Sequence, residues 1–228
     1  MIKALSVINS VCLLIVLLFL SIEIPTFNLS FYSAEYDKYG IPAHINVEKG
    51  DLMTVTERLL SYMKGKAPDL TIETNIAGER REFFNQREKD HMVDVKNLIL
   101  VGFFIRNCAV FIIFTSFIVL ALLRVRFLKT YARTVKNVFI GFLIISSILI
   151  VSVVLNFEKA FTIFHQLFFN NDLWLLNPDT DLLVNIVPLG FFMDISATIG
   201  VIFVVLCLAS ITLSIVYNRI SSTHEAPS

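Results

Sequence analysis

Residues 98–136 read LILVGFFIRNCAVFIIFTSFIVLALLRVRFLKTYARTVK. The part from Leu98 to Leu123 is apolar almost throughout and is long enough to cross roughly 30 Å of hydrocarbon as a helix. The part that follows is basic and has no acidic residue; its charges are Arg124, Arg126, Lys129, Arg133 and Lys136. An apolar span followed by a short basic segment is typical of a membrane helix that ends at the cytoplasmic face.

Three other stretches have similar length and apolar character, so the sequence predicts a mainly α integral membrane protein with four transmembrane helices. Hydrophobic residues make up 56% of the 228 residues, which is more than a soluble domain of this size can bury in one core. The expected segments are a transmembrane helix over 1–24, an extracytoplasmic cap over 25–97, a transmembrane helix over 98–123, a basic cytoplasmic loop over 124–137, a transmembrane helix over 138–156, a second extracytoplasmic loop over 157–190, a transmembrane helix over 191–217 and a cytoplasmic tail over 218–228. A cleaved signal peptide is the alternative for the first segment, but no small-x-small cleavage site precedes Ile24 and Pro25.

The charges of the connections predict the orientation in the membrane. Between the third and fourth spans the bias is acidic, with Glu158, Asp172, Asp179 and Asp181 against a lone Lys159. Lys3 and Arg219 flank the first and last spans. Because cytoplasmic connections carry the excess of Lys and Arg, both termini are expected in the cytoplasm of a multi-pass cell-membrane protein.

The formal net charge is zero, and no basic block is interleaved with aromatic residues on a polar surface, so a nucleic-acid partner is not expected. The three cysteines, Cys12, Cys108 and Cys207, lie inside apolar runs, where cysteine usually behaves as a small buried hydrophobe. No disulfide is expected.

Within the cap, the apolar residues Leu52, Val55, Leu59, Leu60 and Met63 recur at helical spacing. Gly65 follows them as a stop signal, so an amphipathic helix is predicted there. Thr71–Asn75 alternates like a short strand, although one brief run is weak support for a sheet.

Two histidines stand close to the predicted outer boundary of the membrane. If the helix of the second span begins early, His91 and Asp94 share one helix face, so a carboxylate is placed to orient the imidazole. His165 follows the third span in an aromatic setting that includes Phe168 and Trp174. The Phe-Phe pairs near this boundary could line an acyl-chain groove. The alternatives are an interfacial aromatic belt and histidines that are merely hydrogen-bonded boundary residues.

Arg106 lies inside the second span, where a charge is costly unless it snorkels to lipid phosphate, pairs, or faces a polar cavity. Asp194, at the start of the fourth span, is a possible partner on position alone. No nucleophile elbow, H-E-x-x-H motif, P-loop or run of intramembrane acids is present, so a serine hydrolase, zincin or transporter is not indicated. A metal site from His44, His91, His165 and Asp94 stays open, but no ligand spacing supports it and none is expected.

The run Arg87–Lys96, REKDHMVDVK, and the run Phe164–Phe169, FHQLFF, followed by Trp174, Pro178, Asp181 and Pro188, resemble the bacterial lipoprotein intramolecular transacylase family. The resemblance covers nearly the whole chain, including the number of spans and the position of the cap. It implies an enzyme without a cofactor that acts on diacylglyceryl-modified lipoproteins and moves the internal acyl chain to the amine of the N-terminal cysteine. It implies that His91 and His165 are the catalytic pair.

The residue chemistry agrees with what this resemblance implies. An amide is more stable than an ester, so the transfer needs no energy source, and an amine of pKa about 8 must lose a proton to a base such as histidine. We expect Asp94, Lys96, Arg106, Phe168, Trp174 and Asp181 to be supporting or substrate-binding residues. Two rivals remain: an acyltransferase or lipase acting on free phospholipid, and a non-catalytic membrane partner protein. The sequence leaves the oligomeric state open.

Overall fold

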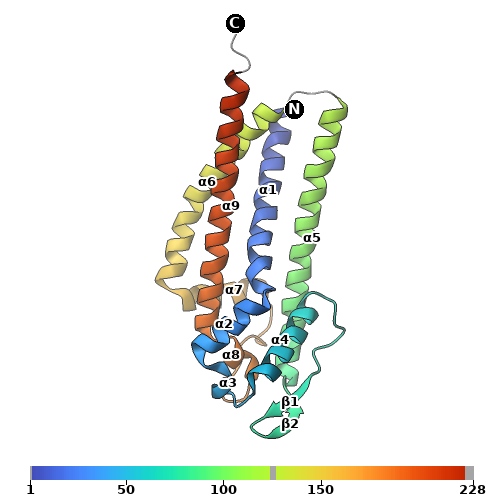
Figure 1. The fold of residues 1–228 in the computed structure, drawn as a ribbon, viewed down its shortest axis with the longest axis vertical. Coiled ribbons are helices and arrows are strands. Elements are labelled where there is room, and N and C mark those ends of the chain that lie inside the picture. The colour runs from blue at the N-terminus through green and yellow to red at the C-terminus, as the bar shows by residue number, and fades with distance from the viewer. Residues whose placement is uncertain (1, 124–126, 224–228) are drawn as a thin grey trace. The chain divides into compact units, whose positions relative to one another are not determined.

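The computed structural model describes residues 2–123 and 127–223, and these are mainly helical (Figure 1). The elements are α1 (Ile2–Thr26), α2 (Leu29–Tyr39), α3 (Ile41–His44), α4 (Lys49–Met63), β1 (Glu73–Ile76), β2 (Glu79–Glu82), α5 (Gln86–Leu122), α6 (Leu128–Leu155), α7 (Phe157–Phe168), α8 (Leu182–Ile186) and α9 (Leu189–Thr223). Of these, α1, α5, α6 and α9 are long and apolar enough to cross a membrane. The prediction of four apolar helices is confirmed.

The helices extend beyond the apolar spans that the sequence predicts. Helix α5 begins at Gln86 rather than near Leu98, and α6 begins at Leu128, so the expected loop over 124–137 is helical from Leu128 onward. Arg124 and Arg126 lie outside the described residues. Hydropathy marks only the apolar part of a helix, and because Lys, Arg and Glu are good helix formers, the polar ends continue the helix unnoticed.

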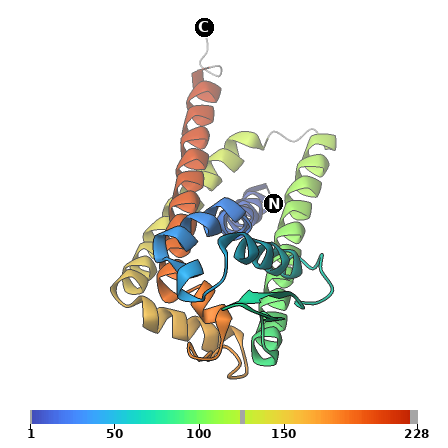
Figure 2. The ribbon, with the colours of Figure 1, turned by 60° about the horizontal axis from the view of Figure 1, so that its bottom comes forward.

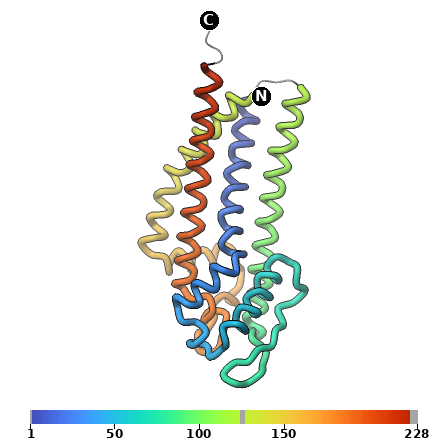
Figure 3. The backbone as a smooth tube through the Cα atoms, in the orientation of Figure 1, coloured from blue at the N-terminus to red at the C-terminus, as the bar shows by residue number. Residues whose placement is uncertain are grey.

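The chain forms two compact units. Unit 1 comprises Met1–Glu23, Phe103–Leu155 and Thr198–Ser228. Its long helices run lengthwise beside one another (Figure 3), and its core combines side chains of α1, α6 and α9: Leu14, Val135, Phe139, Phe203, Cys207 and Ile211. The outward side chains of α6 are large and exposed, as expected of helices whose surroundings are lipid rather than water.

Arg106 belongs to unit 1 and is paired within it. Its guanidinium forms an ion pair with Glu23 of α1 and lies 5.0 Å from the ring centroid of Phe103. The partner that position suggested, Asp194, instead forms its ion pair with Lys38 and accepts a hydrogen bond from Tyr39 at 2.6 Å, inside unit 2. Position in the sequence could not show that Glu23, rather than Asp194, is the carboxylate that pairs with Arg106, because Glu23 comes from α1, a distant part of the chain.

Unit 2 comprises Ile24–Gly102 and Asn156–Ala197. Helix α4 confirms the predicted amphipathic helix: Leu52, Val55, Leu59, Leu60 and Met63 are all buried, and the backbone after it turns at Gly65 with φ of 73°. The α4 helix is joined to α2 by a hydrogen bond of 2.8 Å between the buried hydroxyls of Tyr36 and Thr56. Helix α4 also lies beside the first part of α5 (Figure 2), where a Cβ atom added to Gly65 would lie 3.5 Å from the Leu100 side chain.

A β-hairpin connects α4 to α5. Strands β1 and β2 pair antiparallel with Glu73 opposite Glu82 and Ile76 opposite Glu79. The two turn residues, Ala77 and Gly78, both have positive φ, which matches the twist of a two-residue hairpin turn. The sequence indicated only the first strand, because β2 is charged and exposed throughout and therefore shows no alternation.

Candidate active site

The structure brings His91 of α5 and His165 of α7 together within unit 2. Their ring centroids are 6.1 Å apart and the ring planes are inclined by 33°. Each residue is 7% exposed. The ring of Phe169 contacts both, at 5.4 Å from His91 and 5.6 Å from His165. The pair therefore lies in an apolar enclosure, although its members are 74 positions apart in the sequence (165 − 91).

His165 has a fixed orientation and a fixed tautomer. Its Nδ1 lies 2.7 Å from the carbonyl oxygen of Phe161, and because a carbonyl only accepts, Nδ1 must carry the hydrogen. The ring is stacked on Trp174 with centroids 4.9 Å apart and planes inclined by 29°. These contacts leave Nε2 of the neutral ring with its lone pair, as a proton acceptor.

His91 is held differently. Its Nδ1 is buried and has no hydrogen-bond partner among the described residues. Asp94, expected to orient this imidazole, instead accepts a hydrogen bond of 2.8 Å from Asn171, so it acts on His91 through its charge alone. The expectation failed because a shared helix face brings the two residues near one another without fixing what each of them bonds.

Both imidazoles are kept neutral. Burial lowers the pKa of His91 to about 4, with a further lowering from His165 and Arg87 and an opposing effect of the Asp94 carboxylate. Burial also lowers the pKa of His165, partly offset by the Phe161 carbonyl. A neutral imidazole at neutral pH offers one donor nitrogen and one acceptor nitrogen, which is what proton transfer in both directions requires.

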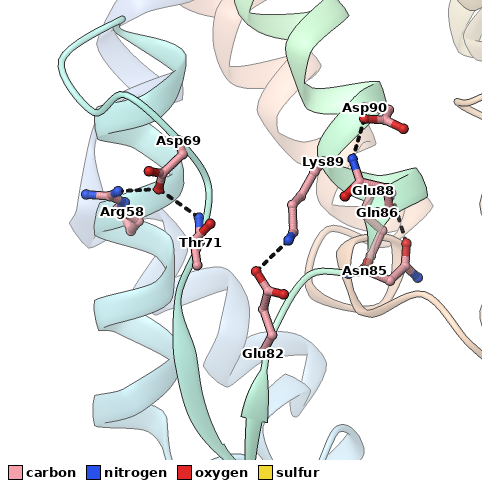
Figure 4. A network of polar contacts seen from close by, with 9 residues as sticks. All are labelled: Arg58, Asp69, Thr71, Glu82, Asn85, Gln86, Glu88, Lys89 and Asp90. Carbon is pink, nitrogen blue, oxygen red and sulfur yellow. Dashed lines mark hydrogen bonds and ion pairs between the residues drawn. The ribbon is translucent and has the colours of Figure 1, made fainter.

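The start of α5 is fixed by a capping box one turn before His91 (Figure 4). The Asn85 side chain accepts from the Glu88 N–H at 3.0 Å, and the Glu88 carboxylate accepts from the Asn85 N–H at 2.7 Å. The other carboxylate oxygen of Glu88 accepts from the Leu183 N–H. Glu88 is 1% exposed, and burial raises its pKa despite the backbone donors, which lower it.

Glu88 thus attaches the helix that carries His91 to the first turn of α8. Glu88 was not among the residues predicted from the sequence, although Asn-x-x-Glu from Asn85 to Glu88 is a recognisable capping-box signature. Arg87 adds to the attachment, since its guanidinium donates to the carbonyl oxygens of Asp172 and Leu175. These polar contacts therefore join the start of α5, which carries His91, to the segment 172–183 that follows His165.

Asp181 completes the same connection. Its carboxylate accepts hydrogen bonds from Asn85 at 2.8 Å, from the Asn177 N–H at 2.7 Å and from the Thr180 hydroxyl at 2.9 Å. Burial by itself would raise the pKa of Asp181, but these hydrogen bonds outweigh it and the pKa is lowered. Asp181 therefore shapes the loop before α8, and these hydrogen bonds join it to Asn85 and to the loop itself.

Two other predicted site residues contact different partners. The Lys96 ammonium lies 4.1 Å from the ring centroid of Tyr62 on α4. Phe168 contacts Phe164, with centroids 4.8 Å apart, and Phe164 in turn lies 5.5 Å from His165. His44, part of the metal alternative, interacts with Asn185 at 3.2 Å. Within residues 2–123 and 127–223, no group of three or more His, Cys, Asp or Glu could hold a metal ion.

A family model described as lipoprotein intramolecular transacylase Lit matches residues 7–192. The chain belongs to the lipoprotein intramolecular transacylase family. The matched range includes both histidines and the polar connection between them. The transacylase is accordingly an enzyme, an acyltransferase of lipoprotein processing, and it is a multi-pass membrane protein with four apolar helices.

Solved structures show the same fold. The membrane integral lipoprotein intramolecular transacylase Lit from Bacillus cereus is similar with a TM-score of 0.76 at 20% identity, over 96% of this chain and 98% of that chain. Variants of that protein with one histidine replaced match as well: the alanine variant has a TM-score of 0.74 at 19% identity, over 99% and 96%, and the arginine variant 0.71 at 20%, over 97% and 95%. A comparison with curated protein sequences gave no match.

Proposed function

We propose that the transacylase moves the sn-2 acyl chain of a diacylglyceryl-cysteine lipoprotein to the amine of that cysteine, giving the lyso-form lipoprotein. The observation that carries this proposal is the pair of neutral, buried imidazoles 6.1 Å apart, one of which has a fixed acceptor nitrogen. The family match supports intramolecular acyl transfer on lipoproteins. The sn-2 position and the amine are the donor and acceptor that the resemblance implies.

In the proposed reaction the amine nitrogen attacks the ester carbonyl carbon. A nitrogen–carbon bond forms, the bond from the acyl carbon to the glyceryl oxygen breaks, and one proton moves from nitrogen to that oxygen. No atom enters or leaves, so the mass of the lipoprotein stays the same. Since the product is an amide formed from an ester, the transfer proceeds without an energy source or a cofactor.

We assign the general base to His165 and the hydrogen-bond donor to His91. His165 donates through Nδ1 to the Phe161 carbonyl, so only Nε2 is left to take the amine proton. His91 is neutral, and its one N–H group can donate a hydrogen bond to the tetrahedral oxyanion or to the leaving glyceryl oxygen. The proton that this oxygen takes is the one that His165 removed from the amine, so both rings return to their neutral forms. Trp174 stacks on the ring of His165 and so fixes the orientation of the base. Asp181 fixes the loop that follows Trp174, by accepting from the Asn177 N–H.

Confinement supplies the rest of the catalysis. The transfer closes a ring of about eight atoms, and holding the reacting groups about 3 to 3.5 Å apart can contribute on the order of 7 to 11 kcal/mol. Aromatic rings around the pair, including Phe161 at 4.2 Å from His165, are suited to hold acyl chains. Phe168 is placed in this group, whereas Lys96 and Arg106 already interact with Tyr62 and Glu23.

We further propose that the site lies at the outer face of the cell membrane. Unit 2 would then be extracytoplasmic and both termini cytoplasmic, because Lys129, Arg133 and Lys136 begin α6 while acidic residues prevail between α6 and α9. The substrates are diacylglyceryl-modified lipoproteins embedded in membrane lipid.

The test is mass spectrometry of one purified diacylglyceryl reporter lipoprotein incubated with the purified transacylase. The expected result is a new N-acyl peptide with no change in total mass. The His91→Ala and His165→Ala variants should lose conversion, while His44→Ala, an exposed histidine, should retain it. Wild-type conversion by either active-site variant overturns the assignment.

The same experiment separates the rivals when labelled free phospholipid is included. An acyltransferase that uses phospholipid predicts a gain in lipoprotein mass and label in the product. A lipase that acts on free phospholipid predicts labelled free fatty acid, with the diacylglyceryl lipoprotein left unconverted. A non-catalytic partner protein predicts that no conversion occurs with purified components.

A further inference from the structure

Helix α7 has three distinct sides. Large apolar side chains are exposed along one stripe: Ile163 at 52%, Phe164 at 45%, Leu167 at 72% and Phe168 at 49%. Polar side chains form a second stripe: Glu158, Lys159, Thr162 and Gln166. The third side holds His165, which is buried, and Phe161, which contacts it and lies 5.0 Å from Phe192 of α9.

The angular order of these sides follows from 3.6 residues per turn. Stepping about 100° per residue, the apolar stripe and the polar stripe lie on opposite sides of the helix axis. His165 falls at a border between them, next to Phe161. The helix therefore has an apolar stripe on one side, a polar stripe on the opposite side, and contacts with the rest of the protein along a border between them. This pattern is typical of an interfacial helix that lies in a membrane surface.

The surroundings of α7 identify what covers its apolar stripe. Only Asn156 separates α7 from α6, a helix able to cross a membrane, so α7 begins where that helix ends. Asn156 also caps α7 by accepting from the Lys159 N–H at 3.0 Å, so α7 begins as a separate helix. Water is a poor environment for four large apolar side chains in one stripe, whereas bilayer lipid lies at the end of every span.

We propose that α7 lies in the bilayer surface, with Ile163, Phe164, Leu167 and Phe168 inserted among the acyl chains of membrane lipid. Its polar stripe faces the headgroups and water. The border between the stripes, where His165 is located, then falls at the depth of the glyceryl ester bonds. The statement about the depth of His165 rests on the proposed function, in which His165 is the catalytic base. In that case α7 is the element that sets the depth of this base in the membrane.

The proposal is tested by site-directed spin labelling of the full chain in phosphatidylcholine and phosphatidylglycerol vesicles. Leu167→Cys and its neighbour Gln166→Cys, which lies in the polar stripe, are labelled in a background in which Cys12, Cys108 and Cys207 are replaced by alanine. The label at 167 should collide readily with oxygen and rarely with a water-soluble nickel chelate. The label at 166 should show the reverse preference.

Equal exposure of both labels to the nickel chelate overturns the proposal, because α7 would then face water. Spin–spin broadening at position 167 overturns it as well, since a second copy of the chain would cover the stripe instead of lipid. The measurement involves no acyl transfer, so it is independent of the histidine roles. A failed mass-spectrometric test would leave the depth profile unchanged, and a failed depth profile would leave the histidine test standing.

Discussion

The two histidines are equally buried, but the regions that carry them hold them by different physical means. Around His91, the start of α5 is fixed by polar contacts: the capping box of Asn85 and Glu88 and the donors of Arg87. Around His165, α7 and the following loop supply rings: Phe161, Phe169 and Trp174. One imidazole is placed through its backbone, the other through contacts on its own ring.

This difference has a consequence for catalysis. A ring with a bonded Nδ1 and a stacked face keeps one tautomer and one orientation, which suits a base that must meet the substrate amine. A ring whose Nδ1 has no hydrogen-bond partner can carry its hydrogen on either nitrogen. Its N–H group can therefore be directed at the oxygen on which negative charge develops, which suits a hydrogen-bond donor. The difference also predicts which substitutions affect which histidine.

The largest of these effects is expected at the aromatic side. Trp174→Ala removes the stacked partner of His165 and should lower kcat about 100-fold, since a small misplacement of a catalytic group can cost that much. Trp174→Phe keeps a ring face and should recover most of the rate. The measurement is the rate of conversion of the reporter lipoprotein. The control is Leu175→Ala, a substitution of the neighbouring exposed residue. Full activity of Trp174→Ala would show that stacking does not position the base.

A smaller effect is expected at the polar side. Glu88→Gln turns an acceptor of two backbone N–H groups partly into a donor, which should cost about 1–3 kcal/mol of stability. It should lower kcat about tenfold with little change in KM, because the substrate contacts remain while the spacing of the histidines loosens. Thermal unfolding and initial rates are both measured.

The matched control is Glu82→Gln, an acid at the end of β2 that pairs with Lys89 of α5 at the surface. It should change stability by less than about 1 kcal/mol. If Glu88→Gln loses stability without any change in kcat, Glu88 holds the fold but does not position His91.

The pH dependence tests the neutrality of both rings. Each imidazole gains a proton as the pH falls through its pKa. Because burial lowers both pKa values, each ring stays neutral to a lower pH than an exposed histidine does. A histidine of ordinary pKa, about 6.5, would leave about one tenth of the activity at pH 5.5. Beyond the limb that the substrate amine itself imposes, we expect the acid limb due to the enzyme to lie below pH 6.5, because burial lowers both pKa values. A limb centred at 6.5 would show that the ring that limits activity is not desolvated in the free enzyme.

The smallest effect is expected for Asp94→Asn. Since Asp94 bonds Asn171 and not His91, the rate should change by less than about threefold, in line with substitutions that remove no buried contact. A loss of 100-fold would revive the hypothesis that this carboxylate orients His91. Initial rates at neutral pH decide between the two.

The sequence predicted the fold largely through its spans, because a bilayer imposes a length and an apolar composition that single residues rarely disturb. It also predicted α4, whose apolar residues keep strict helical spacing. It missed strand β2, whose residues are all exposed, and it placed the beginnings of α5 and α6 too late. Strand β2 has no burial pattern to mark it, whereas the starts of α5 and α6 lie outside the apolar spans by which those helices were recognised.

At the candidate site, the two histidines and Trp174 followed from their motifs and aromatic setting. The partners of Asp94 and Arg106 could not be predicted, because they come from distant segments of the chain. Asp94 bonds Asn171, and Arg106 pairs with Glu23. Helical periodicity indicates which residues share a face, but not which loop comes to rest against that face. Glu88 shows the opposite case, since its capping signature was present in the sequence and was overlooked.

The most direct test of the account is a double-mutant cycle of the two histidines. His91→Gln, His165→Gln and the double variant are compared for conversion of the reporter lipoprotein, with folding checked by gel filtration and circular dichroism. If base and donor act as one unit, each single variant should lose about 100-fold to 10,000-fold, and the double variant should lose about as much as the worse single one. Losses that multiply would contradict a paired mechanism and assign the two rings to separate tasks.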